Sequence, residues 1–149
     1  MPSAAEIALK IEASLPLITK AIQGAEALGV ETMYALMARR IFNEGKKTDG
    51  TLIGAYSGSY KKTRERKGLE TDYVNLQFSD RLFQSLAIGT LDSKVTFGMT
   101  DANRIEVAGH LEKKFGVIFQ PSQQEVEQVS IKAREYLFEQ LELIVKSWQ

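Results

Sequence analysis

The chain contains no cysteine and only one histidine, His110, among its 149 residues. The lack of cysteine excludes disulfides, thiolate catalysis and metal sites built on thiolates, and it is compatible with a reducing cytoplasm. A single histidine leaves little to activate a serine or threonine nucleophile. A metal site would depend on carboxylates, and no calcium-loop pattern occurs. We therefore expect neither a cofactor nor a bound metal.

An excess of one charge sign is also missing. Nineteen basic residues balance nineteen acidic ones, so no overall field draws the chain to nucleic acid or to an anionic membrane. No stretch approaches the roughly 20 apolar residues that span a bilayer, and the first residues lack the pattern of a signal peptide. We expect a soluble, cytosolic protein without membrane contact. The length predicts one domain, residues 1–149.

The first 45 residues have the apolar spacing of helices. Ser14 and Pro16 suit an N-cap and an early helical position, which favours a break there, and Gly29 is a second expected break. The helical period resumes and continues to Gly45, a residue type that often ends helices. We predict N-terminal helices with one or two interruptions. The apolar positions of the first part are Ile7, Ile11, Leu15, Ile18, Ile22 and Ala25.

Residues 46–80 have no such period. They contain three turn sequences, at residues 48–50 (TDG), 57–59 (SGS) and 67–68 (KG), so we predict a long, mostly irregular connection. A loop of this length is uncommon in a compact domain and usually has a function or is ordered by a partner.

Two alternating segments, residues 86–90 and 95–99, predict a β-hairpin with its turn at Asp92 and Ser93. An isolated hairpin is marginal in water, so it must pack on the helices or pair with strands of another copy. Asp101 and Gly116 then bound a short helix. The predicted fold class is α+β: N-terminal helices, a long loop, a β-hairpin, a short helix and a long C-terminal helix.

The last predicted helix, residues 122–148, has two apolar stripes. The main stripe has apolar residues at every third or fourth position. The second stripe consists of Ile131, Phe138 and Val145 at steps of seven residues. One small domain rarely covers both faces of a helix, so the second stripe either meets a neighbouring subunit or lies in the chain's own core.

The strongest local cluster of charge is residues 60–67 (YKKTRERK), which we call the basic segment. Clustered lysines and arginines can neutralise phosphates, so a small DNA-binding accessory protein is one interpretation. A solvated face or a protein contact is the other, and the absence of a recognised nucleic-acid motif favours it. The candidate interaction residues of this segment are Lys61, Lys62, Arg64, Arg66 and Lys67.

Two sequences come near catalytic motifs without matching them. Residues 54–58 (GAYSG) are one position out of register with a nucleophile elbow. Residues 40–47 lack both the leading glycine and the hydroxyl residue of a phosphate-binding loop. We predict that the chain is not an enzyme.

Several short motifs, between about residues 29 and 141, follow one another in an order that resembles a known family. The segments are residues 42–45 (FNEG), 48–51 (TDGT), 60–68 (YKKTRERKG), 76–86 (LQFSDRLFQSL), 108–116 (AGHLEKKFG) and 118–122 (IFQPS). Taken in this order, they resemble motifs of the virion-morphogenesis and tail-completion proteins of long-tailed bacteriophages, including the phage Mu type.

The resemblance implies a structural protein of the phage neck, where the filled head joins the tail, and brings no catalytic residues with it. It implies a homo-oligomeric ring beside the connector or adaptor and the tail terminator or tail tube. A subunit in this position could also contact the packaged DNA. The implied location is the virion neck or tail, and the host cytoplasm during assembly.

Overall fold

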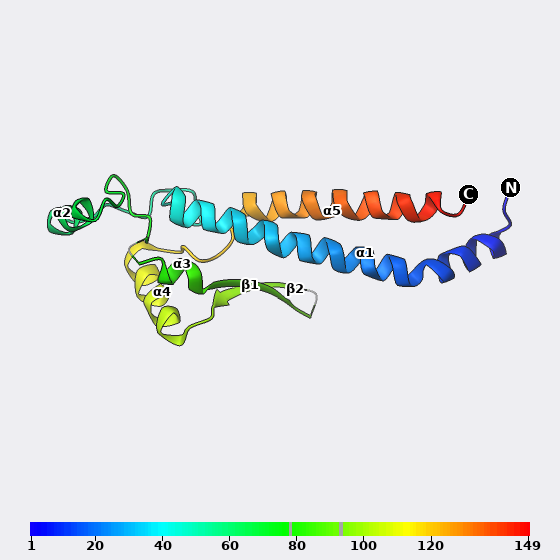
Figure 1. The fold of residues 1–149 in the computed structure, drawn as a ribbon, viewed down its shortest axis with the longest axis horizontal. Helices are drawn as coiled ribbons and strands as arrows, with labels where there is room; N and C mark the ends of the chain where they lie inside the picture. Colours follow the sequence, from blue (N-terminus) through cyan, green and yellow to red (C-terminus); the bar gives the residue numbers. More distant parts are fainter. Residues whose placement is uncertain (78, 93) are drawn as a thin grey trace.

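The computed structural model describes residues 1–77, 79–92 and 94–149. Two long helices, α1 and α5, pack against each other in opposite directions, and both chain termini lie at the same end of an elongated molecule (Figure 1). A smaller lobe with the remaining elements lies at the other end. The elements are α1 (Ala4–Ala38), the π-helix η1 (Arg39–Asn43), α2 (Gly58–Arg66), α3 (Arg81–Ser85), β1 (Leu86–Leu91), β2 (Lys94–Met99), α4 (Ala102–Phe115) and α5 (Gln123–Lys146). The predicted α+β class is confirmed.

Helix α1 runs without interruption through both predicted breaks, so those two predictions were wrong. Pro16 lies inside the helix and lacks the N–H that would bond to the preceding turn. Figure 1 shows the helix changing direction in its blue, N-terminal part. Gly29 is buried against α5, where a Cβ would lie 3.5 Å from Val129. Packing between the helices therefore outweighs the local preference of glycine for a helix end.

The end of this helical segment was predicted correctly. α1 passes into η1, and Gly45 follows in the left-handed conformation with φ of +62°. A side chain at this position would collide with Tyr73 and with the backbone of Val74, so both conformation and space require glycine.

The hydrophobic core lies in the part of the molecule that we call the head, residues 29–129. Met37, Ile41, Phe42 and Ile118 are completely buried there. The ring of Phe42 meets the ring of Phe83 edge-on, with centroids 5.1 Å apart, a favourable arrangement for two aromatic rings.

The predicted long loop, residues 46–80, is less irregular than expected. It contains α2, and its flanks are anchored in the core by Ile53 and Val74. The apolar period does not reveal α2 because its one buried residue is Arg64. Phe78, within this region, lies outside the described residues.

The hairpin forms as predicted, with Leu86 opposite Met99 and Ile88 opposite Phe97. Of the two predicted arrangements, packing on the chain's own helices is the one observed, because β1 contacts α1 and β2 contacts α4. Leu86 is buried in the head core. The predicted turn includes Ser93, which lies outside the described residues.

The last two helices begin at the predicted positions, Asp101 and Ser122. The side chain of Asp101 accepts a hydrogen bond from the backbone of Asn103, 2.8 Å away, and Gly116 ends α4. Ser122 and Glu125 form a reciprocal capping box at the start of α5. Such caps satisfy N–H groups that the first helical turn leaves unpaired.

Candidate functional site

A pocket of about 510 Å³ lies in the head between α4 and the segment that carries α2 and α3. We call it the head pocket. Its walls are mostly apolar and aromatic, and four cationic side chains and one carboxylate lie among them. The lining residues used below are Tyr56, Tyr60, Arg64, Asp80, Arg81, Arg104, Val107, Leu111 and Lys114.

Arg64 forms part of the wall of the head pocket and is only 1% exposed. Its guanidinium donates hydrogen bonds to the carbonyls of Glu70 at 2.7 Å and Gln77 at 2.8 Å, and to the side chain of Asn75 at 3.0 Å. It also lies 4.4 Å from the centre of the Tyr56 ring. Arg64 therefore holds α2 against the head and does not lie on an exposed basic face.

Tyr56 connects the same wall to the chain that follows. Its hydroxyl donates to the Asn75 side chain at 3.3 Å and accepts from the Asn75 backbone N–H at 3.2 Å. Burial raises the pKa of the Tyr56 hydroxyl above its ordinary value. The tyrosine therefore stays neutral and acts as a fixed donor and acceptor in the pocket wall.

Three other cations of the head pocket have no acidic partner within the described part of the chain: Arg81, Arg104 and Lys114. The Nε of Arg104 is shielded from solvent and has no hydrogen-bond partner there. The pocket contributes a single carboxylate, Asp80. Arg81 and Lys114 are exposed and Arg104 is half-buried, so the shielded Nε of Arg104 is the costly group among them. Carboxylates form charge-assisted hydrogen bonds with such cations, so this pocket favours a ligand with carboxylates and an apolar side chain.

The second candidate surface lies on α5. The three residues of the second apolar stripe are exposed: Ile131 is 52% exposed, Phe138 61% and Val145 48%. Of the two interpretations left open by the sequence, burial in the chain's own core is therefore wrong. Glu135, Glu139 and Glu142 lie beside Phe138 in one shallow hollow of the helix surface, which Lys146 also lines. We call the side of α5 formed by these residues the arm face.

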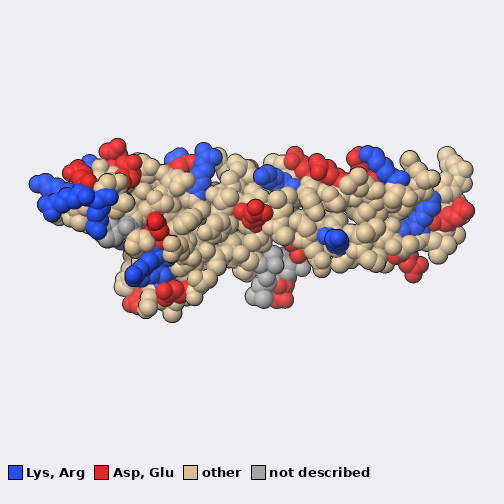
Figure 2. All heavy atoms as spheres, in the orientation of Figure 1, with Lys and Arg blue, Asp and Glu red and all other residues tan. Residues whose placement is uncertain are grey.

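The basic segment lies on and just after α2, at the end of the molecule opposite the two termini (Figure 2). Lys62, Arg66 and Lys67 are exposed and Lys61 is half-buried. With Arg64 turned inward, the exposed part of the segment is smaller than the sequence suggests. Figure 2 shows Lys and Arg side chains gathered at this end.

Sequence reasoning missed the head pocket, because its cations come from two elements: Arg81 from α3, and Arg104 and Lys114 from α4. It also missed a buried ion pair between Arg40 and Glu125, whose Nε and Oε1 atoms lie 2.7 Å apart. Arg40 donates further to the carbonyls of Ile118 at 3.0 Å and Gln120 at 2.8 Å. This network joins η1 to the start of α5, and its role is structural.

Within residues 1–77, 79–92 and 94–149 no group of three or more acidic or histidine side chains could hold a metal ion. Over the same residues no helix is both long and apolar enough to cross a membrane. His110 lies on the surface of α4, 3.6 Å from Glu106.

Comparisons of the chain with models of protein families, with curated proteins and with solved structures give no match.

Proposed function

We propose that the chain is a structural subunit of the neck of a long-tailed bacteriophage, which assembles into a ring and joins the head connector to the tail. The order of sequence motifs points to this family. The observation that carries the proposal is the uncovered apolar surface of the two long helices, which we describe next.

The part of the molecule away from the head, which we call the arm, consists of residues 4–28 of α1, residues 130–146 of α5 and the two residues that follow α5. Its buried residues are few and mostly small, among them Ala21, Ala25 and Ile144. Large apolar side chains point outward on both helices. They are Ile7, Leu9, Ile11, Leu15, Leu17, Ile22, Ile131, Phe138, Leu143 and Val145.

An exposed apolar surface on two paired helices is typical of a protein–protein interface. A subunit of a ring between connector and tail needs contacts both to its own copies and to other proteins. The arm and the head pocket would supply them without any catalytic group.

Light scattering coupled to size-exclusion chromatography tests this role. We expect the purified chain to form a complex with the purified connector or with the tail tube, and to oligomerise alone or on that partner. A chain that remains monomeric and binds neither would contradict the proposal.

A DNA-binding accessory protein is the second candidate, because Lys62 and Arg66 are exposed on the projecting helix α2. Affinity for double-stranded DNA, measured over a series of salt concentrations, separates the two functions. Phosphate contacts predict a steep loss of affinity with salt. Absence of binding at low salt removes this candidate and leaves the neck role intact.

A further inference from the structure

We infer that the arm face of one copy binds in the head pocket of the next copy, with Phe138 as the apolar anchor. In this contact the glutamates around Phe138 pair with the cations of the pocket. The inference rests on the proposed ring and identifies which surfaces of the chain form it.

The two surfaces are complementary in charge. The head pocket contains Arg81, Arg104 and Lys114 without acidic partners among the described residues. The arm face contributes Glu135 and Glu139, and neither forms an ion pair within the described part of the chain. A third glutamate, Glu142, has only an exposed contact of 3.6 Å with Lys146, which is worth little in water.

The two surfaces are also complementary in apolar character. Val107, Leu111 and Phe115 line the pocket along one side of α4. Phe138 is 61% exposed, whereas Phe97 and Tyr60 are each 38% exposed. It lies beside the glutamates of the arm face. A large aromatic anchor in an apolar pocket, surrounded by charge pairs, is the usual arrangement of an interface hot spot.

Pairing of like surfaces is disfavoured. Two arm faces would place Glu135, Glu139 and Glu142 opposite the same carboxylates, and two head pockets would bring their arginines together. The whole chain is neutral, so this separation of charge favours contact between copies through unlike surfaces.

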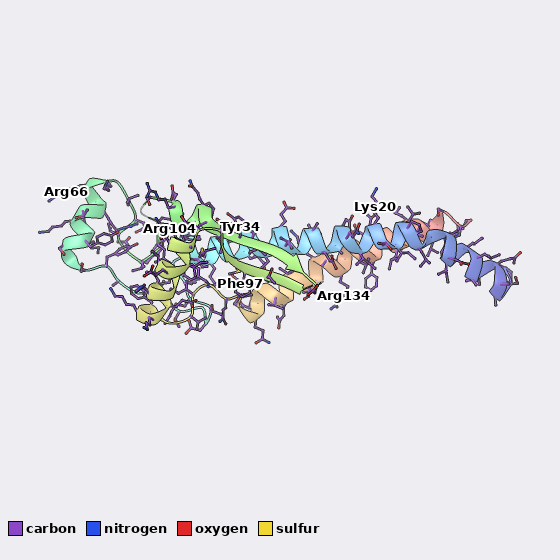
Figure 3. The ribbon with its side chains drawn as sticks, turned by 90° about the horizontal axis from the view of Figure 1, so that it is seen from below. Lys20, Tyr34, Arg66, Phe97, Arg104 and Arg134 are labelled. Atoms are coloured by element: carbon purple, nitrogen blue, oxygen red, sulfur yellow. The ribbon has the colours of Figure 1, made fainter. Side chains whose placement is uncertain are left out.

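The positions of the two surfaces determine the kind of assembly. α4 lies near one end of the molecule and the C-terminal half of α5 lies at the other (Figure 1). Figure 3 shows Arg104 on α4 in the head, whereas α5 continues past Arg134 toward the opposite end of the molecule. A contact between two different surfaces repeats in the same direction from one copy to the next. The copies form a closed ring when the rotation between neighbours divides a full turn evenly.

The absence of cysteine makes the contact directly testable by crosslinking. The variant with both Val145→Cys and Val107→Cys keeps Phe138 and is treated with a short bis-maleimide in its folded, full-length form. Val145 is 48% exposed and lines the same hollow as Phe138, so we expect a ladder of crosslinked oligomers. In the matched control, Leu52→Cys replaces Val107→Cys, because Leu52 is 56% exposed and does not line the pocket. The control should give no ladder beyond that of Val145→Cys alone.

Charge reversal provides the second test. Arg81→Glu with Arg104→Glu blocks the pocket, and Glu135→Lys with Glu139→Lys blocks the arm face. We expect each pair to weaken association about tenfold or more. An equimolar mixture of the two variants should associate again, because the unaltered arm face and pocket match each other and the two charge-reversed surfaces are also complementary. Circular dichroism checks that each variant is folded, and combining all four changes in one chain should restore association.

Equal ladders in the crosslinking variant and its control would overturn the inference, as would unchanged association after charge reversal. If the charge-reversed chains still form rings and bind the connector, the contact is wrong and the neck role stands. If the unaltered chain neither associates nor binds connector or tail tube, both are contradicted.

Discussion

The head and the arm are built on different principles. The head buries large side chains around Phe42 and Ile118 and has a buried ion pair between Arg40 and Glu125. The arm is two helices in contact through small residues, and Gly24 leaves room for the ring of Tyr136. Its large apolar side chains remain outside.

This difference separates stability from assembly. The head has the packing density that stabilises a domain by itself, whereas two helices cannot cover their own apolar surface. We expect substitutions in the head to change the free energy of unfolding, and substitutions on the arm face to change association. The predictions below test this division, from the largest expected effect to the smallest.

Replacement of Phe42 should have the largest effect. Phe42→Ala removes a completely buried ring and its contact with Phe83, which should lower the free energy of unfolding by about 4 kcal/mol. The matched change Phe138→Ala on the arm face should lower it by no more than about 0.5 kcal/mol. Urea denaturation of dilute, monomeric protein measures both. Similar losses for the two variants would contradict the division into head and arm.

The buried ion pair should come second. Glu125→Ala leaves Arg40 buried without its carboxylate and removes the capping box of α5, at a cost of about 3 kcal/mol. Glu142→Ala breaks an exposed pair with Lys146 and should cost about 0.5 kcal/mol or less. Thermal unfolding followed by circular dichroism compares them. A larger loss of stability for Glu142→Ala than for Glu125→Ala would contradict the division, because it would mean that an ion pair of the arm stabilises the fold more than the buried pair of the head.

The two arginines of α2 give a sharper comparison within the head. Arg64→Met removes three hydrogen bonds from a buried side chain and should cost about 2 kcal/mol. Arg66→Met changes an exposed side chain and should leave stability nearly unchanged. Hydrogen exchange over residues 58–77 should increase only for Arg64→Met. Equal exchange in both variants would show that α2 is not held by Arg64.

The smallest effect is expected at the far end of the arm. The indole N–H of Trp148 donates to the hydroxyl of Ser14 at 2.9 Å, and Ser14→Ala should cost about 1 kcal/mol or less. Trp148 is the only tryptophan, so its fluorescence reports on the arm alone. We expect the fluorescence transition in urea to shift to lower concentration, while the hydrogen-exchange transition of α4, which lies in the head, is unchanged. A common shift of both signals would mean that the arm unfolds together with the head.

The sequence by itself determined the local features. Asp101, Ser122 and Gly116 mark helix ends because caps act on the backbone within a few positions. The hairpin and the last helix were predicted for the same reason, since alternation and a period of three to four residues are local patterns. The second stripe on α5 was visible in the sequence, but its exposure was not.

Only the tertiary structure decided the rest. α1 continues through Gly29 because α5 packs against it, and α2 escaped prediction because its inward residue, Arg64, is charged. Arg104 and Lys114 lie on α4 and Arg81 lies on α3, so only the packing of α4 on the segment before it brings the three cations into one pocket. Contacts between residues far apart in sequence leave no periodic signal, which is why the arm face could be suspected from the sequence and the head pocket could not.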